Sequence, residues 1–438
     1  MGATWNIWPL FRRRKSTLSS AVLSENKDPA PSPQAKDTST TYRHDLAAVK
    51  DGIALTQQAA LLLQGPKEKY TLKKDHEIPQ VTAEQEMLIR VSVVGLNPID
   101  WKAPDYNFGI PSFPFLCGRD LAGVVIQAPT APSHLKVGDV VSSVSTDYRD
   151  YRKAAFQEYA VTTDFNAWRI PTRSSPEHAA SIGVAFITSV FALGACLGVT
   201  FSAMVPDIAA PKLFEQLSSL DPENIPEDVR GAVTDRIAES DRPKAGDWIA
   251  IWGGTSSCSS ATGYMAVQLA KSAGLRVVCV ADIAKHGARL VNLGADLLID
   301  RLDTDRAVTI LREVTGGQLR FGVDTVGKET ATLLRAAMKV PAEGARQDSH
   351  LVGLTGLPKD IIEGITHHSV PIKLFHLIPE IGSGIMLWLE ELVAHDVIAT
   401  PEVDVARGGL EGVNDALDTM RRGSTSGRRV VVPLEVQQ

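Results

Sequence analysis

Glycine and hydroxyl side chains gather at one turn of the chain, GGTSSCSS at residues 253–260. The turn follows the apolar run WIAIW and precedes a stripe in which Ala261, Met265 and Leu269 recur every four residues, and a β-branched run resumes after Gly274. These patterns predict a strand, a helix and a second, parallel strand. The first N–H groups of such a helix bind phosphate, and glycine allows the phosphate to approach the backbone. The turn therefore predicts a dinucleotide site.

We predict that five residues of this turn contact the cofactor: Gly253, Gly254, Thr255, Ser256 and Ser257. Of the three glycines in the pattern G-x-G-x-x-G only Gly253 is present, and Thr255 and Cys258 occupy the other two places. The strand and helix context supports the dinucleotide site, whereas the glycine pattern is a poor match. A hydroxyl-rich helix cap that binds nothing therefore stays open as an alternative.

An acidic residue, Asp282, stands at the end of the second predicted strand. A carboxylate there accepts hydrogen bonds from the ribose hydroxyls of NADH and repels the 2′-phosphate of NADPH. Lys285, His286 and Arg289 follow, and basic side chains can bind that phosphate. We predict that Asp282, Lys285 and Arg289 contact the cofactor, and the residues alone leave NADPH and NADH both open.

Length and composition restrict the class of protein. The chain has 438 residues, 44% hydrophobic and 22% charged, with a net charge of −6, which predicts a globular protein of about two to three domains. The acidic balance argues against nucleic acid as a partner, because no basic stripe is present. The four cysteines are widely spaced without CxxC, so neither a disulfide framework nor a cysteine-rich zinc site is expected. The sequence contains no run of 18 apolar residues, so no membrane span is expected.

The chain changes character along its length. Residues 1–50 begin with a basic, acid-free stretch and continue rich in Pro, Ser and Thr, which predicts a disordered or targeting extension. We expect a cytoplasmic protein, and the basic start leaves a mitochondrial location open.

Short apolar runs from residue 57 predict a β-rich, barrel-like domain. Residues 201–245 predict an acidic insertion of two short helices, either a partner-binding lid or a neutral elaboration. From residue 247 alternating strands and helices predict a doubly wound parallel sheet, an α/β architecture.

Six motifs occur in an order that resembles the medium-chain dehydrogenase/reductase superfamily. They are GLNPIDWK (95–102), PFLCGRDLAGVV (114–125), VGDVV (137–141), FQEYAV (156–161), AASIGVAFITSVFAL (179–193) and the turn and helix at 253–274. The chain looks most like the zinc-free fungal branch that contains trans-acting enoyl reductases and quinone-reductase-like dehydrogenases of secondary metabolism. The resemblance covers about residues 54–435, less the insertion.

The resemblance implies a domain arrangement. A GroES-like catalytic domain spans residues 51–190 and is completed by 372–438. A Rossmann nucleotide-binding domain spans 191–371 and carries the insertion at 201–245. The cleft between the two domains would hold NADPH, which the branch prefers, or NADH.

The same resemblance assigns roles in the catalytic domain. The loop of Asn97 lies against the nicotinamide in this branch, so Asn97 is expected to bind the cofactor. Lys102 is the catalytic candidate, which either donates to a carbonyl oxygen or pairs with Asp100. Asp120 is expected to fix the loop by accepting backbone N–H bonds. Zinc-dependent relatives have ligands at 97–100, at 118–120 and at 182–189, where this chain has none, so no metal is expected.

We therefore expect an NAD(P)H-dependent, zinc-free oxidoreductase that reduces an activated C=C bond, in an enoyl thioester or enone. Reduction of a quinone or carbonyl is the alternative within enzymes, and a non-catalytic dinucleotide-binding scaffold is the alternative of another class. The expected partners are a small-molecule or carrier-bound acyl substrate and, as a candidate, a polyketide synthase. A monomer and a homodimer both stay open. Trp248 and Trp252 are expected to pack, and the adjacent His367 and His368 are not expected to chelate a metal together.

Overall fold

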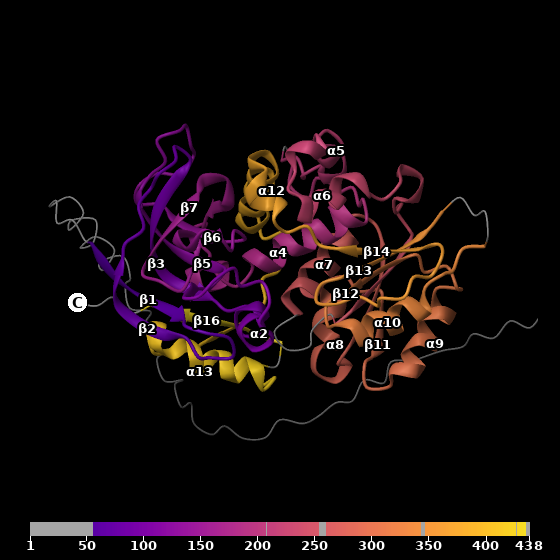
Figure 1. Ribbon diagram of the computed structural model, residues 1–438. Helices are drawn as coiled ribbons and strands as arrows, with labels where there is room; N and C mark the ends of the chain where they lie inside the picture. Colours follow the sequence, from indigo (N-terminus) through magenta and orange to yellow (C-terminus); the bar gives the residue numbers. More distant parts are fainter. Residues whose placement is uncertain (1–55, 207, 254–259, 343–346, 426, 435–438) are drawn as a thin grey trace, which may run out of the picture. The chain divides into compact units, whose positions relative to one another are not determined.

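The computed structural model describes residues 56–434, apart from residues 207, 254–259, 343–346 and 426. All of these belong to one of the two units into which the chain divides, residues 49–438. The described strands form three sheets. Two of them belong to the β-rich part, and the third is the parallel sheet that follows it (Figure 1).

The β-rich part contains a three-stranded sheet of order β2-β1-β4 and a seven-stranded sheet of order β15-β16-β3-β5-β6-β8, with β7 paired to β3. Their bounds are β1 Gln57–Leu63, β2 Thr71–Glu77, β3 Glu86–Gly95, β4 Phe115–Leu116, β5 Asp120–Gln127, β6 Val140–Val144, β7 Tyr159–Thr163, β8 Ala167–Arg169, β15 Val403–Val405 and β16 Arg429–Pro433. β3 alternates because Met87, Ile89 and Val91 face the core. β16, from the far end of the chain, pairs antiparallel with β3 and extends this sheet.

The parallel sheet has the order β11-β10-β9-β12-β13-β14. Its strands are β9 Trp248–Trp252, β10 Arg276–Ala281, β11 Leu297–Asp300, β12 Phe321–Asp324, β13 Ser349–Gly353 and β14 Ile365–Ser369, and the helices between them are α7 Ser260–Ser272, α8 Ile283–Asn292, α9 Thr304–Val314 and α10 Lys328–Ala337. In chain order this is 3-2-1-4-5-6, and the order reverses between β9 and β12, where dinucleotides bind in such folds. The predicted doubly wound sheet is confirmed.

β9 is buried on both faces, which explains its unbroken apolar sequence. Ile249 packs on one face in the same cluster as Met265 of α7. Trp248 and Trp252 pack on the other face in the same cluster as Leu334 of α10. The prediction that both tryptophans serve packing is confirmed.

The remaining helices are α2 Pro98–Tyr106, α3 Pro176–Ala179, α4 Gly183–Val190, α5 Leu213–Ser218, α6 Glu227–Thr234, α11 Leu374–Leu377, α12 Pro379–Ala394 and α13 Gly409–Arg421. Short 3-10 turns lie at Tyr151–Lys153, Asp164–Asn166, Pro222–Asn224 and Glu239–Asp241, and a π-helical stretch, Phe191–Cys196, continues α4. α4 packs against α7, and Ser189 donates a hydrogen bond to the carbonyl of Thr262. α4 therefore joins the β-rich part to the nucleotide sheet.

Among the described residues one helical run, Pro176–Cys196, is long and apolar enough to cross a membrane. In this fold 89% of its apolar window is buried inside the protein, as in the core helix of a globular domain. The expectation of no membrane span stays a prediction.

The acidic insertion forms the two short helices predicted from its sequence, α5 and α6. Their apolar sides, with Leu213, Leu217 and Val233, pack into the main core. On its polar side Asp228 of α6 forms an ion pair with Lys373, which directly precedes α11. The insertion is therefore part of the folded core and borders the segment that leaves β14.

Candidate functional site

Gly253 directly follows β9 at the carboxyl edge of the parallel sheet. Its φ is +96°, and its N–H donates to the carbonyl of Val280 at 2.9 Å. A Cβ at this position would lie 2.4 Å from Thr325 Oγ1 and 2.5 Å from a methyl group of Val326. Both the left-handed backbone and the close contact with the turn after β12 require glycine at this position.

The other four residues predicted to hold the pyrophosphate are Gly254, Thr255, Ser256 and Ser257, and they lie outside the described residues. α7 begins directly after them, at Ser260. Their cofactor contacts stay predictions.

The turn after β12 supports Gly253, and the sequence reading missed it. Thr325 Oγ1 donates to the carbonyls of Trp252 and Gly253 at 3.2 and 3.1 Å. Asp324 Oδ1 accepts the N–H groups of Val326 and Gly327 at 3.0 and 2.8 Å. In the part of the chain that the structure describes, Asp324 Oδ2 is buried without a hydrogen-bond partner, and burial raises the pKa of this carboxyl to about 6. The signal in the sequence was Asp-Thr at the end of the strand that neighbours β9.

Asp282 caps α8 at the end of β10. Its Oδ1 accepts the N–H of Lys285 at 3.3 Å, while its Oδ2 lies 3.5 Å from Lys285 Nζ and 3.6 Å from Arg301 Nη2. Burial, which by itself raises the pKa of this carboxyl, is outweighed by the Lys285 N–H bond and the charges of Lys285 and Arg301, so the pKa is lowered. Asp282 is therefore a carboxylate at neutral pH with two cations beside it.

Arg301 is a second residue that the sequence reading missed, because it follows a different strand, β11. Arg289 was predicted with Asp282 and Lys285, but it lies one helical turn further along α8 and forms an ion pair with Glu402. The structure therefore brings Asp282, Lys285 and Arg301 together and gives Arg289 another partner.

Asn97 is buried in the β-rich part, with 3% of its surface exposed. Its Nδ2 donates to Asp120 Oδ2 at 2.9 Å, its Oδ1 accepts from Arg429 Nη2 at 2.8 Å, and its backbone N–H donates to Asp100 Oδ2 at 2.7 Å. Both ends of the amide are thus engaged inside the protein. The structure supplies a structural role for Asn97, and its predicted contact with the cofactor stays a prediction.

Two buried carboxylates stand beside Asn97. Burial raises the pKa of Asp100 and of Asp120 to about 6, and the charges of Arg119 and Arg429 respectively limit the rise. Asp120 Oδ1 accepts the N–H of Val184 at the start of α4, at 2.8 Å. Asp120 therefore accepts a backbone N–H bond, which is the role expected for it.

Lys102 lies on α2, half-buried, with its Nζ 5.7 Å from the centre of the Trp101 ring. Asp100 is fully buried and accepts the N–H of Asn97. Pairing with Asp100, one of the two roles expected for Lys102, stays a prediction. Donation to a substrate carbonyl stays a prediction.

The loop after β6 contacts the segment that leaves the parallel sheet. Thr146 follows β6, and its Oγ1 lies 2.7 Å from Nδ1 of His376 on α11. α11 follows β14, so this segment leaves the carboxyl edge of the parallel sheet, the edge that carries Gly253 and Asp282. The loop at 145–150 is therefore joined to the segment that leaves this edge.

Comparisons with known proteins give the family. The model of the alcohol dehydrogenase GroES-like domain matches residues 83–172, and that of the zinc-binding dehydrogenase family matches residues 261–368. The trans-enoyl reductase traG of Penicillium crustosum is 27% identical over 371 residues, which cover 79% of this chain and 89% of that protein. The trans-enoyl reductase himH of Aspergillus japonicus is 25% identical over 358 residues, with coverages of 80% and 90%.

Solved structures share the whole two-part fold. An alcohol dehydrogenase superfamily protein from Novosphingobium aromaticivorans has a TM-score of 0.63 at 19% identity, over 86% of this chain and all of that one. The Escherichia coli quinone oxidoreductase complexed with NADPH has a TM-score of 0.61 at 18% identity, over 86% and 99%. Both parts of this chain therefore match domains of the medium-chain dehydrogenase/reductase superfamily.

The place of a superfamily zinc ion is filled here by other groups. Among the described residues no three His, Cys, Asp or Glu side chains are gathered so that they could hold a metal ion. Arg119 occupies the position at which zinc-dependent relatives are expected to carry a histidine ligand. Asp100 and Cys117 are among the groups that interact electrostatically with it. Among the described residues, this position therefore carries a cation where a zinc site needs a neutral or anionic ligand.

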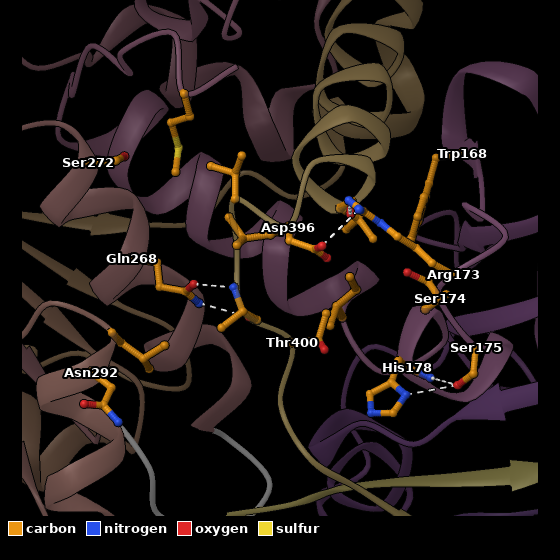
Figure 2. A pocket seen from close by; sticks show the side chains of 18 of the residues that line it. Trp168, Arg173, Ser174, Ser175, His178, Gln268, Ser272, Asn292, Asp396 and Thr400 are labelled. Atoms are coloured by element: carbon orange, nitrogen blue, oxygen red, sulfur yellow. Dashed lines mark hydrogen bonds and ion pairs between the residues drawn. The ribbon is translucent and has the colours of Figure 1, made fainter. Parts of the chain in front are cut away.

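A pocket lies at the amino edge of the parallel sheet, opposite the edge at which the cofactor crevice is predicted. This pocket, of about 650 Å³, is lined by the last turns of α7 and α8, by the segment before α3 and by residues 393–400. Helices of a parallel sheet run back from the carboxyl edge to the amino edge, so these last turns lie far from Gly253. Figure 2 shows that some of its polar side chains are paired, Arg173 with Asp396, His178 with Ser175, and Gln268 with the backbone of residue 399.

Proposed function

We propose that this protein is an NADPH-dependent oxidoreductase that reduces the C=C bond of an enoyl thioester or enone, without zinc and in secondary metabolism. Gly253 carries the proposal, because it follows β9 at the reversal point between β9 and β12, where dinucleotides bind in folds of this kind. The names of the two fungal relatives described above support the enoyl reductase activity. A carrier-bound acyl chain delivered by a polyketide synthase is the proposed substrate.

Charges beside Asp282 favour NADPH over NADH. A lone carboxylate at this place would repel a 2′-phosphate. Here Asp282 is engaged by the N–H of Lys285, and two cations, Lys285 and Arg301, stand within 3.6 Å of it. Lys285 is exposed over 61% of its side chain and Arg301 over 40%, so both can turn to a phosphate. The local charge of the three side chains is then positive.

Different residues of this chain have different roles in the proposed reaction. NADPH, when bound, supplies a hydride. Gly253, held by Thr325, leaves room for the pyrophosphate, and Lys285 and Arg301 bind the ribose phosphate. Lys102 donates to the substrate carbonyl oxygen, where charge develops. Asn97 holds the loop that carries Lys102 against the sheet of β5.

Reduction of a quinone or carbonyl is the second candidate, since proteins named quinone oxidoreductase share the fold. The proposed location is the cytoplasm, with the mitochondrion as the alternative raised by the basic start of the chain. A scaffold that binds the dinucleotide without turnover is the alternative of another class.

Calorimetric titration of the full chain with NADPH and with NADH tests the cofactor, and NADPH oxidation in the presence of a 2-enoyl thioester, an enone, a quinone and an aldehyde tests the reaction. We expect NADPH to bind more tightly than NADH and the enoyl thioester or enone to be reduced fastest. Faster turnover of the quinone or aldehyde would favour the second candidate. Tight binding without turnover of the whole panel would favour the scaffold, and binding of neither nucleotide would overturn every enzyme assignment.

A further inference from the structure

Arg119 is a buried cation whose partners are rings rather than acceptors. It lies between β4 and β5 with 3% of its surface exposed. Its guanidinium carbon is 3.8 Å from the centre of the Tyr148 ring and 5.8 Å from that of Phe115. Across the described residues its Nε is buried with no hydrogen-bond acceptor, and the charge of Asp100 acts on the guanidinium. Stacking on a ring holds a guanidinium in one orientation and leaves its edge free to donate.

The second buried arginine of this region, Arg429, shows what a purely structural guanidinium looks like in the same fold. Its Nε donates to the carbonyl of Ser181 at 3.0 Å, its Nη2 donates to Asn97 at 2.8 Å, and Asp120 lies 3.7 Å away. Leaving a buried charge without an acceptor is costly, and natural proteins retain such groups mainly where a ligand completes them. Arg119 is therefore incomplete in a way that Arg429 is not.

Arg119 is bonded to the loop after β6. Its carbonyl accepts the N–H of Ser145 at 2.8 Å, and Ser145 Oγ is itself buried without a partner in the described chain. The next residue, Thr146, contacts His376 on the segment that leaves the carboxyl edge of the parallel sheet, and Tyr148 stacks on the guanidinium of Arg119. Two donors without an acceptor, Arg119 Nε and Ser145 Oγ, thus belong to one loop assembly that contacts the segment leaving this edge.

We propose that Arg119 is a catalytic residue in addition to Lys102, that it binds the carbonyl oxygen of the α,β-unsaturated substrate, with Ser145 Oγ as a further donor, and that it stabilises the enolate formed during reduction. This assignment rests on the proposed function. Hydride from the reduced nicotinamide forms a bond to the β-carbon as the C=C π bond breaks. The electron pair moves to the carbonyl oxygen, where Arg119 holds the negative charge. Protonation of the α-carbon by solvent then restores the C=O bond, and the nicotinamide leaves oxidised.

Steady-state kinetics of three variants tests the assignment, with calorimetry as a readout independent of turnover. Arg119→Met is expected to lower kcat for the enoyl thioester about 100-fold, as for loss of an oxyanion donor, while the Kd of NADPH stays within about twofold. Arg119→Lys keeps the charge and is expected to recover part of kcat. Arg422→Met removes an exposed arginine of α13 in the same part of the fold and is the matched control with unchanged kcat.

Chemical rescue separates a catalytic guanidinium from a structural one. Added guanidinium is expected to raise kcat of Arg119→Ala severalfold and to leave wild type unchanged. Binding of a saturated acyl thioester, measured by calorimetry, is expected to weaken in Arg119→Met. If Arg119→Met does not fold, Arg119→Lys and the rescue of Arg119→Ala decide the question.

Two outcomes would overturn the assignment without touching the proposed function. One is an Arg119→Met protein that keeps kcat within about twofold of wild type. The other is a loss of NADPH affinity and thermal stability in all three Arg119 variants with no rescue by guanidinium, which would make the residue structural. A wild-type protein that binds NADPH but reduces no enoyl substrate would instead overturn the proposed function, and this assignment with it.

Discussion

At the scale of single residues, cofactor choice depends on how a carboxylate is compensated. Asp282 by its identity alone indicates NADH, since an acidic residue at this place repels a 2′-phosphate. The structure adds two facts about its surroundings, the cap that Asp282 forms on α8 and the cation of Arg301 from the next strand end. Because a capped and paired carboxylate presents less negative charge, we propose that Arg301 decides between the two nucleotides.

We expect Arg301→Gln to weaken NADPH binding about tenfold, which corresponds to one charge-assisted hydrogen bond to a phosphate. NADH has no 2′-phosphate, so its affinity is expected to change less than about twofold. Calorimetric titration of both nucleotides measures the two affinities. Arg306→Gln is the matched control, because Arg306 is an exposed arginine five positions further on, on α9. Equal losses for NADPH and NADH would show that Arg301 does not contact the 2′-phosphate.

At the scale of elements, the pairing of β13 with β14 brings two histidines into contact. His350 Nδ1 lies 3.0 Å from His368 Nε2, and the two rings stack with centres 5.2 Å apart. Neighbouring residues of a strand point to opposite faces, so His367 does not take part in this contact. Burial lowers the pKa of both His350 and His368 to about 4, which keeps the pair neutral at pH 7.

This pair predicts a loss of stability in acid. The folded pKa of about 4 lies below the ordinary histidine pKa of 6.5, so the unfolded chain binds more protons between these values. Stability from the pair is present above pH 6.5 and is lost as the pH falls through 4. We expect His368→Gln to lose less free energy of unfolding than wild type between pH 7 and pH 4.5, by about 1 kcal/mol.

Urea unfolding at the two pH values measures this difference. His395→Gln, a change at an exposed histidine after α12, is the control and is expected to follow wild type. A His368→Gln protein whose pH dependence equals that of wild type would contradict the lowered pKa.

At the scale of the whole molecule, one core joins the β-rich part, the insertion and the nucleotide sheet. Trp388 of α12 is 1% exposed and contacts the rings of Phe186 on α4 and Phe201 before the insertion, at 5.6 and 5.3 Å between ring centres. These three elements are far apart in the sequence. Their shared core holds α4, and through it α7, in place beneath the turn at Gly253.

We expect Trp388→Ala to lower the free energy of unfolding by about 3–5 kcal/mol, because it removes a large buried ring and leaves a cavity between three elements. Chemical unfolding followed by circular dichroism measures the loss. Leu387→Ala, on the same helix but 43% exposed, is expected to cost no more than about 0.5 kcal/mol. Similar costs for the two variants would mean that α12 does not organise the common core.

The sequence by itself determined the elements and their order. The apolar run of β9, the four-residue period of α7 and the glycine between them are local signals, and they predicted the parallel sheet and the place of the crevice. Gly253 was identified because a turn with left-handed backbone favours glycine, which is visible in the sequence. The two tryptophans of β9 were predicted to pack because they flank this strand, and both lie in one buried cluster.

Only the tertiary structure decided which side chains meet. Arg301 reaches Asp282, and Arg119 reaches Tyr148, across loops whose register no local pattern encodes. Asn97 was predicted to bind the cofactor, but its amide oxygen accepts a hydrogen bond from Arg429 instead. Arg429 lies 332 positions away in the sequence, so no local pattern indicated this contact. The physical reason is that strand pairing is non-local, so partners are chosen by how β16 and β3, or β10 and β11, align in space.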